Sequence, residues 1–324
     1  MDSLLKVPLS LNSPVLFLVF NRPETTARVF EAIRVAKPAR LYVACDGPRA
    51  EKNGEAAIVA QVQEIATAVD WPCELHTLFR KENLGCKYAV SSAIDWFFGK
   101  EPSGIILEDD CLPNQSFFRF CEEILARYET NSRIMSVTGS NITKDVTFEE
   151  DSYFSIYPLM WGWATWARSW KMYDRELLSW PKTDKRNLLK AIHPSNVAAR
   201  IVWRRIFETT YRGYVDTWDF QWIYSCWKEG GLTVAPSQNL VSNIGFSADA
   251  THTTEMDPML SELPLRELPQ QIGSPVAISS HKKADRYTGR YWFKETLPNA
   301  AKSLLLMSPV VENWVVALKQ AIRR

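Results

Sequence analysis

The sequence lacks several features that would assign the protein to a class at once. No window approaches the roughly 18 consecutive apolar residues that a membrane-spanning helix needs. Its 6 cysteines show no paired spacing of the kind that holds a metal, and 324 residues are too many for a disulfide-stapled mini-domain. Residues 1–13 contain no apolar stretch typical of a secretory signal. We therefore expect a cytoplasmic protein with reduced thiols.

Net charge is also nearly absent. Lys plus Arg number 38 against 37 for Asp plus Glu, which leaves a formal charge of +1. Because no excess of positive charge is present, we expect no nucleic-acid partner. The chain does contain 46% hydrophobic residues, enough for a sizeable core, and 13 tryptophans. Indole rings suit both buried cores and the faces of sugar rings, so their number alone does not choose between these roles.

The first 130 residues alternate between short apolar runs and amphipathic stretches. Each run reads as a buried strand that ends in a polar turn, and each stretch that follows has helical periodicity. The expected strands cover 14–20, 41–45, 74–79 and 104–107, and the expected helices cover about 23–36, 54–69, 86–98 and a segment from about 114. This alternation predicts an α/β fold with a mostly parallel central sheet and helices on both faces.

The regular alternation then stops. Residues 133–139 are expected to form a fifth strand, 195–212 and 219–228 two helices, and 232–235 a last short strand. Residues 258–275 are rich in Pro, Glu and Leu, which suggests a lid or linker. An apolar stripe within 304–324 indicates a terminal helix that either docks on the body or makes peripheral contact with a membrane surface, and docking is favoured.

Three consecutive acids, Glu108, Asp109 and Asp110, follow the fourth expected strand, and we call them the acid triplet. Neighbouring carboxylates repel one another and are costly to bury, so they need either water or a compensating cation. A divalent ion such as Mg²⁺ or Mn²⁺ suits carboxylate oxygens and commonly arrives with a substrate diphosphate. The alternative is a solvated acidic turn without function.

Other polar residues follow the neighbouring strands. Parallel strands deliver their carboxyl ends to one edge of the sheet, where open α/β folds bind ligands. Asn21 and Arg22, Asp46, and the loop 83–87 should therefore meet the acid triplet there. Arg22 and Lys87 could offset phosphate charge, while Asp46 could accept a hydrogen bond from a base or ribose. Each also has an ordinary interpretation as a turn or surface residue.

These segments resemble a known family. Residues 18–23 (LVFNRP), 45–47 (CDG), 82–85 (ENLG) and 105–110 (IILEDD) are similar to the motifs of metal-dependent glycosyltransferases of the type A fold, within the nucleotide-diphospho-sugar transferase superfamily. The likeness covers about residues 14–250 and includes family 2 enzymes and N-acetylglucosaminyltransferase I. A bacterial relative acting on surface glycans fits this chain better than a Golgi enzyme.

The resemblance implies a nucleotide-sugar donor, most simply a UDP-sugar, and a divalent metal, Mn²⁺ or Mg²⁺. It implies metal binding by Asp110 and by His252, although a histidine in a Thr-rich loop is also an ordinary solvated residue. The donor-binding residues that it implies are Phe20, Asn21, Arg22, Asp46, Asn83, Gly85, Lys87, Glu108 and Asp109. It also implies a nucleotide-sugar-binding half at 1–140, an acceptor-binding and catalytic half at 141–257, and a C-terminal lid and helical tail at 258–324.

Asp219 is the expected catalytic base. It falls at a predicted helix start, where the ordinary interpretation is a helix cap. The resemblance instead implies a carboxylate that takes the proton from an acceptor hydroxyl, with Asp216 in reserve. Residues 161–166 (WGWATW), which we call the aromatic segment, are expected to bind a glycan or glycolipid acceptor, and core packing is the alternative for at least half of its tryptophans. The expected acceptor residues are Trp161, Gly162, Trp163 and Trp218.

Together these patterns predict an inverting glycosyltransferase for surface polysaccharide or lipopolysaccharide synthesis. A sugar nucleotidyltransferase is the first rival, although no Gly-rich basic loop follows the first strand. A glycan-binding protein without catalytic activity is the second rival, and a metal-dependent hydrolase is a weaker third. The sequence does not distinguish which sugar or acceptor is used.

Overall fold

The computed structural model describes residues 11–245 and 263–307. The centre of the molecule is an eight-stranded sheet in the order β3-β2-β1-β4-β8-β6-β9-β7. Its strands are β1 (Val15–Val19), β2 (Arg40–Cys45), β3 (Glu74–Phe79), β4 (Ser103–Glu108), β6 (Ile134–Thr138), β7 (Ser152–Ser155), β8 (Trp163–Trp166) and β9 (Leu232–Pro236). β5 (Cys111–Pro113) and β10 (Val241–Asn243) form a separate antiparallel ribbon.

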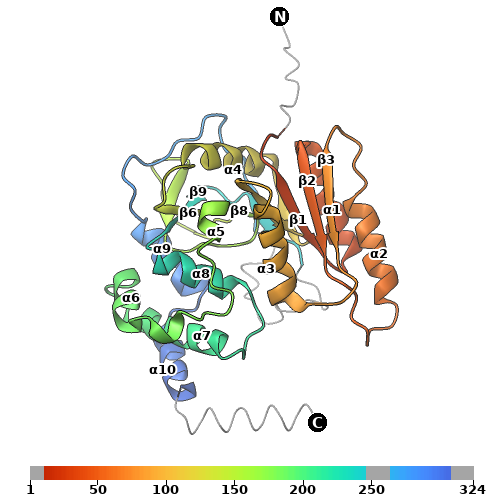
Figure 1. The fold of residues 1–324 in the computed structure, drawn as a ribbon. Helices are drawn as coiled ribbons and strands as arrows, with labels where there is room; N and C mark the ends of the chain where they lie inside the picture. The colour runs from red at the N-terminus through yellow and green to blue at the C-terminus, as the bar shows by residue number, and fades with distance from the viewer. Residues whose placement is uncertain (1–10, 246–262, 308–324) are drawn as a thin grey trace, which may run out of the picture.

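Strands β3, β2, β1 and β4 pair in parallel, and so do β6 and β9. Only β8 and β7 run against their neighbours in this sheet. The expected α/β class with a mostly parallel sheet is therefore confirmed, and Figure 1 shows the helices placed around the sheet. Because β1, β2 and β4 point the same way, their carboxyl ends meet at one edge of the sheet.

Helices cover both faces of this sheet. They are α1 (Pro23–Ala36), α2 (Glu55–Ala66), α3 (Gly85–Phe98), α4 (Gln115–Arg127), α5 (Ala167–Trp170), α6 (Lys185–Ile192), α7 (Val197–Tyr211), α8 (Asp219–Lys228), α9 (Lys282–Tyr291) and α10 (Leu297–Leu306), with a short 3₁₀ helix, η1 (Trp180–Lys182). Successive strand residues alternate between two cores. Val15 and Phe17 pack with α1, α2 and α4, whereas Leu16 and Leu18 pack with α3 and α8.

The expected elements of the first half lie close to their observed positions. The structure adds a strand that the sequence did not predict, since the aromatic segment forms β8 between β4 and β6. Trp163 packs in the core beside α3 and α8, while Ala164 and Trp166 pack in the core beside α4. A strand buried on both faces shows no alternation of polar and apolar residues, so its pattern was not recognisable.

The C-terminal segment is held against the body. Leu268 and Ile272 are buried in the core beside α4. Arg119 and Arg127 of α4 donate hydrogen bonds to the carbonyl oxygens of these two residues, at 2.8 and 2.9 Å respectively. Residues 263–275 thus pack on α4, and the assignment of 258–275 as a lid or linker stays a prediction, with 258–262 outside the described residues. The predicted terminal helix lies mainly outside the described residues, and none of the described helices is long and apolar enough to cross a membrane.

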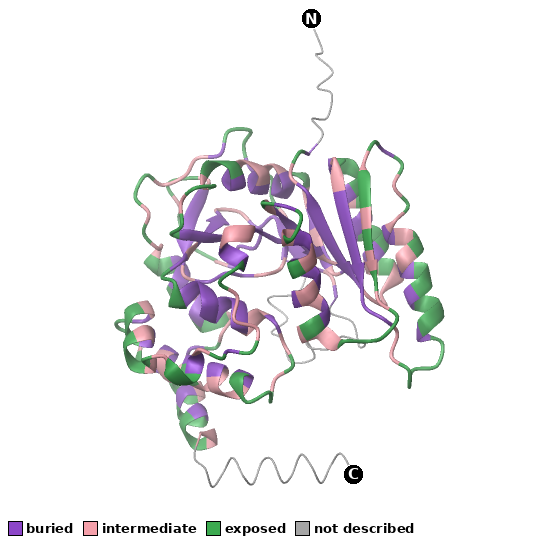
Figure 2. Cartoon of the chain, viewed as in Figure 1, coloured by how far each residue is buried: buried purple, intermediate pink, exposed green. Residues whose placement is uncertain are grey.

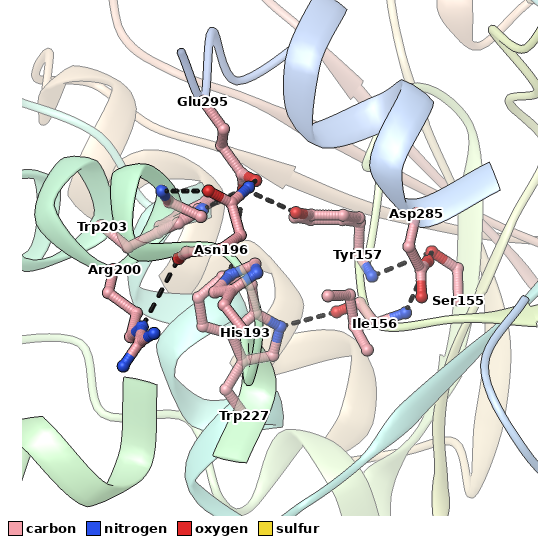
Figure 3. Close-up of polar contacts among 11 residues, drawn as sticks. Ser155, Ile156, Tyr157, His193, Asn196, Arg200, Trp203, Trp227, Asp285 and Glu295 are labelled. Atoms are coloured by element: carbon pink, nitrogen blue, oxygen red, sulfur yellow. Dashed lines mark hydrogen bonds and ion pairs between the residues drawn. The ribbon is translucent and has the colours of Figure 1, made fainter. Parts of the chain in front are cut away.

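A buried polar group centred on Glu295 joins α7 to the C-terminal segment (Figure 3). We call it the Glu295 cluster, and its members are Glu295, Tyr157, Trp203, Asn196 and His193. Tyr157 Oη and Trp203 Nε1 donate to Glu295 Oε1 at 2.5 and 2.6 Å, and Asn196 Nδ2 donates to Glu295 Oε2 at 3.3 Å. His193 Nε2 lies 3.9 Å from the same carboxylate. Burial raises the pKa of Glu295 and lowers the pKa of His193 to about 4.

Candidate functional site

The acid triplet lies where the sequence placed it, at the carboxyl end of a central strand. Glu108 is the last residue of β4, and Asp109 and Asp110 form the turn that leads into β5. β4 pairs with β1, so the triplet faces the Phe20–Arg22 connection between β1 and α1. The short strand β5 then carries the chain away, which holds the three carboxylates at the sheet edge.

Contacts from the β1–α1 connection fix the triplet. Arg22 Nη1 lies 2.7 Å from Asp110 Oδ2 and 3.5 Å from Asp109 Oδ1. The backbone N–H of Phe20 donates to Asp109 Oδ2 at 3.1 Å. Arg22, predicted to offset phosphate charge, therefore offsets the charge of the triplet itself in this structure.

One arginine does not balance three acids. Burial, followed by the charges of Asp110, Asp109 and Asp219, raises the pKa of Glu108 well above its ordinary value. Burial and the Asp110 charge also raise the pKa of Asp109 to about 7, against the opposing effect of Arg22. Carboxyl groups held in this state favour any additional positive charge that reaches them.

The chain after β10 closes against Asp110. The Ile244 N–H donates to the Asp110 carbonyl oxygen at 2.8 Å. A Cβ atom built on Gly245 would lie 2.5 Å from Asp110 Oδ2, so only glycine fits beside this carboxylate. The sequence analysis missed this contact, because nothing local to residue 245 indicates that a distant strand turn packs on it.

Asp46, at the end of β2, ties two loops together. Its carboxylate accepts hydrogen bonds from the N–H groups of Leu84 at 3.0 Å and Gly85 at 3.1 Å. Gly85 has a φ of 77°, which favours glycine at the start of α3. Asn83 Nδ2 donates to the Gly47 carbonyl at 2.8 Å. Asp46, Asn83 and Gly85 thus shape one wall of the sheet edge through contacts among themselves.

Two other residues that were predicted to bind the nucleotide-sugar donor have their polar contacts outside the acid triplet. Asn21 Nδ2 donates to Glu55 Oε1 at 2.9 Å, which joins the β1–α1 connection to the start of α2. Lys87 Nζ lies 2.6 Å from Glu176 Oε2. Both residues belong to connections that follow the parallel strands, and contact of either side chain with the nucleotide-sugar donor stays a prediction.

Asp219 is the first residue of α8, and its charge contributes to the raised pKa of Glu108. Thr217 Oγ1 donates to Asp219 Oδ1, and the Phe220 N–H donates to the same oxygen at 2.7 Å. Trp218, one residue earlier, occupies the capping position, and its side chain makes no capping hydrogen bond. Asp219 is thus oriented by its own loop.

The start of α3 connects these carboxylates. Burial and then the charges of Glu108, Asp219, Asp216 and Asp46 raise the pKa of the Cys86 thiol. A Cβ atom on the adjacent glycine of α3 would lie 3.4 Å from Asp216 Oδ2. Acids from β2, β4 and the α8 loop therefore surround a single helix start, a convergence that sequence order does not reveal.

The predicted acceptor residues behave differently from the acids. Trp163 is fully buried, Trp218 is 4% exposed, and their rings stack with centroids 5.6 Å apart. A Cβ atom on Gly162 would lie 2.7 Å from Val241 Cγ2, so Gly162 lies closely against a core side chain and not against an open acceptor site. These three residues pack in the interior, which agrees with the alternative of core packing, and acceptor contact by any of them stays a prediction. Trp161 is partly buried against Trp292, with centroids 4.3 Å apart.

The residues present fit a hard divalent cation. Within 11–245 and 263–307, no three acidic, histidine or cysteine side chains gather closely enough to hold an ion by themselves. Carboxylate oxygens are nevertheless the donors that Mg²⁺ and Mn²⁺ prefer, and such ions often use one or two carboxylates together with substrate phosphates. Asp110 offers such a carboxylate. The predicted ligand His252 lies outside the described residues.

No protein-family model and no curated protein matches the chain. Solved structures give distant likenesses, each covering a stated share of this chain and of the other. They include HddC from Yersinia pseudotuberculosis (12% identity, 44% and 57% covered, TM-score 0.25), a UDP-glucose pyrophosphorylase complexed with UDP-glucose (9%, 69% and 90%, 0.35) and an active-site mutant of LgtC (11%, 85% and 94%, 0.36). The chain thus spans little more than half of HddC. At these scores, function has to be argued from the site residues.

Proposed function

We propose that the protein is an inverting, metal-dependent glycosyltransferase that moves a sugar from a nucleotide diphosphate, such as UDP, to a hydroxyl of a glycan or glycolipid. One observation carries the proposal. The crowded acid triplet lies at the carboxyl end of β4 and is paired with one arginine, Arg22, and the charge of the helix-start carboxylate Asp219 acts on Glu108 of the triplet. Excess negative charge at a ligand-binding edge supports a function that brings a cation and a diphosphate.

In this proposal Asp110 would hold a Mn²⁺ or Mg²⁺ ion, which would neutralise the charge of the leaving diphosphate. Asp109 and Glu108 face the nucleotide. Arg22 pairs with Asp110 in this structure, and with Asp110 engaged by a cation the Arg22 guanidinium would be able to contact phosphate oxygens of the donor. Asp46 and Asn83 form the wall against which the base and ribose rest.

Asp219 serves as the general base. The acceptor oxygen attacks the anomeric carbon, the bond from that carbon to the diphosphate oxygen breaks, and the hydroxyl proton passes to the Asp219 carboxylate. The Thr217 hydroxyl and the Phe220 N–H both donate hydrogen bonds to Asp219 Oδ1, and these two bonds orient the carboxylate. Attack opposite to the leaving group inverts the anomeric configuration and needs no covalent enzyme intermediate.

The nucleotidyltransferase rival finds less support. Only Phe20, Asn21 and Arg22 connect β1 to α1, and none is glycine. A phosphate loop that cradles a triphosphate normally needs several backbone N–H groups made accessible by glycine.

Thermal stabilisation against a panel of nucleotide sugars, with and without Mn²⁺, tests the proposal. A ligand that binds only the folded state raises the melting temperature, so we expect one nucleotide sugar to do so in the presence of Mn²⁺. Stabilisation by a nucleoside triphosphate with a sugar phosphate, in place of the nucleotide sugar, would indicate the nucleotidyltransferase. Stabilisation by glycans alone, with no response to nucleotide or metal, would indicate a glycan-binding protein.

A further inference from the structure

The two edges of the central sheet differ in how they are protected. At one edge, β7 is covered by the C-terminal segment, since Phe154 bridges to Ser280 and accepts a hydrogen bond from the His281 N–H at 2.7 Å. At the other edge, β3 pairs only with β2 among residues 11–245 and 263–307. Figure 2 shows β3 as a partly exposed strand beside the buried strands β1 and β2.

β3 contains no lysine, no proline and no bulge, which are devices that commonly keep an edge strand from pairing. Its one acidic residue is Glu74, at its first position. β3 reads Glu-Leu-His-Thr-Leu-Phe, and its register with β2 is unbroken over six residue pairs. Leu75 is 36% exposed and Phe79 is 38% exposed, while Tyr88 on the neighbouring α3 is 46% exposed. The edge is therefore regular, partly apolar and open.

The backbone of β3 fixes which groups face outward. The N–H groups of Glu74 and Arg80 donate to carbonyl oxygens on the β2 side, at 2.9 and 3.0 Å. Hydrogen-bonding groups in a strand alternate in direction, so the N–H and C=O groups of Leu75, Thr77 and Phe79 point away from β2. These three residues form a row of hydrogen-bonding groups with no partner strand among the described residues.

We propose that β3 pairs with β3 of a second copy of this chain, antiparallel and centred on Thr77, to form a twofold dimer with a continuous sheet. A twofold axis through Thr77 places it opposite its own copy and places Leu75 opposite Phe79 of the second copy. These are the residues whose backbone groups point outward, so the hydrogen bonds and the symmetry require the same register.

Charge complementarity supports a second copy as the occupant. In the same register Glu74 lies opposite Arg80 of the second copy, and the pair occurs twice because of the twofold axis. Arg80 also donates to Ser92 Oγ on α3 at 2.7 Å, which holds its side chain beside the strand. One shift of register would break the opposition of Glu74 and Arg80 as well as the hydrogen-bond pairing.

The dimer should be reversible. Two six-residue strands bury less surface than most stable interfaces, so we expect a dissociation constant of about 1–100 μM. The sheet edges that carry the acid triplets of the two copies point in opposite directions, because the paired strands run antiparallel. The proposal is therefore independent of the proposed transferase function.

Sedimentation of the full-length protein over a range of concentrations is the first test. The wild type should shift from monomer to dimer, and Thr77→Pro, which removes an outward N–H, should remain monomeric. Thr77→Val keeps that N–H and should dimerise like the wild type. A wild type that stays monomeric at all concentrations, or a folded Thr77→Pro variant that still dimerises, would overturn the proposal.

Cross-linking tests the register. In an antiparallel hydrogen-bonded pair the opposing Cα atoms lie about 5.5 Å apart, within reach of a disulfide. Under a mild oxidant, Thr77→Cys should give a covalent dimer above the wild-type background. Leu75→Cys should not, since its own copy lies four residues along the partner strand. Equal cross-linking of both variants would contradict the register.

Charge reversal gives a rescue experiment. Glu74→Arg places two arginines opposite each other at both ends of the pair, and the dissociation constant should rise about tenfold. Arg80→Glu should act similarly, and the double variant should restore dimerisation. If the double variant dimerised more weakly than either single variant, Glu74 and Arg80 would not lie opposite each other in the dimer.

Discussion

The acid triplet and the Glu295 cluster both contain buried carboxyl groups with raised pKa values, yet their neighbours differ. Glu295 accepts hydrogen bonds from tyrosine, tryptophan and asparagine side chains. Asp109 and Asp110 share one arginine and stand beside Glu108 and Asp219. The cluster supplies several hydrogen-bond donors to one carboxylate, whereas the triplet has one arginine for three acids.

We interpret this difference as one between a structural site and a functional site. A satisfied polar network stabilises the fold, and removing its acceptor leaves buried donors without partners. Crowded carboxylates reduce stability and are retained where a ligand compensates them. We therefore expect substitutions at the two sites to have opposite effects on stability and on activity.

The largest effect is expected at Asp219. Asp219→Asn should lower turnover by about 10²–10⁴-fold, because an amide cannot accept the proton of the acceptor hydroxyl. Steady-state kinetics with the nucleotide sugar that the thermal-stabilisation panel identifies would measure the loss. Asp184→Asn changes an exposed aspartate that caps α6 through Asn187 and should leave turnover unchanged. Normal turnover of Asp219→Asn would exclude it as the base and make Asp216 the next residue to test.

Glu295→Ala should act on the fold. The change leaves Tyr157 Oη and Trp203 Nε1 without their acceptor, and we expect the free energy of unfolding to fall by about 3 kcal/mol. Urea denaturation followed by tryptophan fluorescence measures this loss. Turnover per folded molecule should stay near that of the wild type, and a selective loss of activity would mean that the cluster belongs to the site.

His193 predicts a pH dependence of stability. Its pKa is lowered from an ordinary 6.5 to about 4, so the unfolded chain binds a proton at a higher pH than the folded chain. Stability should therefore fall as pH drops from about 6.5 to about 4, by up to about 3 kcal/mol. Denaturation across this range should show a shallower pH dependence for His193→Gln. Identical slopes for the two proteins would contradict the burial of a neutral histidine.

The smallest expected effect is a gain. The pKa of Asp109 is raised to about 7, so its contribution to stability is lost as pH rises from about 4 through 7. Asp109→Asn should be more stable than the wild type at pH 8, by about 1 kcal/mol, and similar to it at pH 5. Melting temperatures at both values test this, and destabilisation at pH 8 would show that the triplet is structural.

Sequence reasoning succeeded where local patterns carry the information. The strands before Asp46 and Glu108 were recognisable as short apolar runs, and their order placed these acids at one edge. It failed where distant contacts decide. Trp163 lies in a strand inserted between β4 and β6, and nothing near it in sequence indicates those neighbours. Gly245 and Glu295 likewise acquire their roles only from residues that are far away in the sequence.

The central claim is that the acid triplet binds a metal and a diphosphate. Calorimetric titration of UDP into the wild type and into Asp110→Ala, each with and without Mn²⁺, tests it most directly. We predict that Mn²⁺ strengthens binding to the wild type and that Asp110→Ala loses this Mn²⁺-dependent gain, by at least about tenfold in affinity. Full Mn²⁺-dependent binding by Asp110→Ala would contradict the account and leave the triplet an acidic turn.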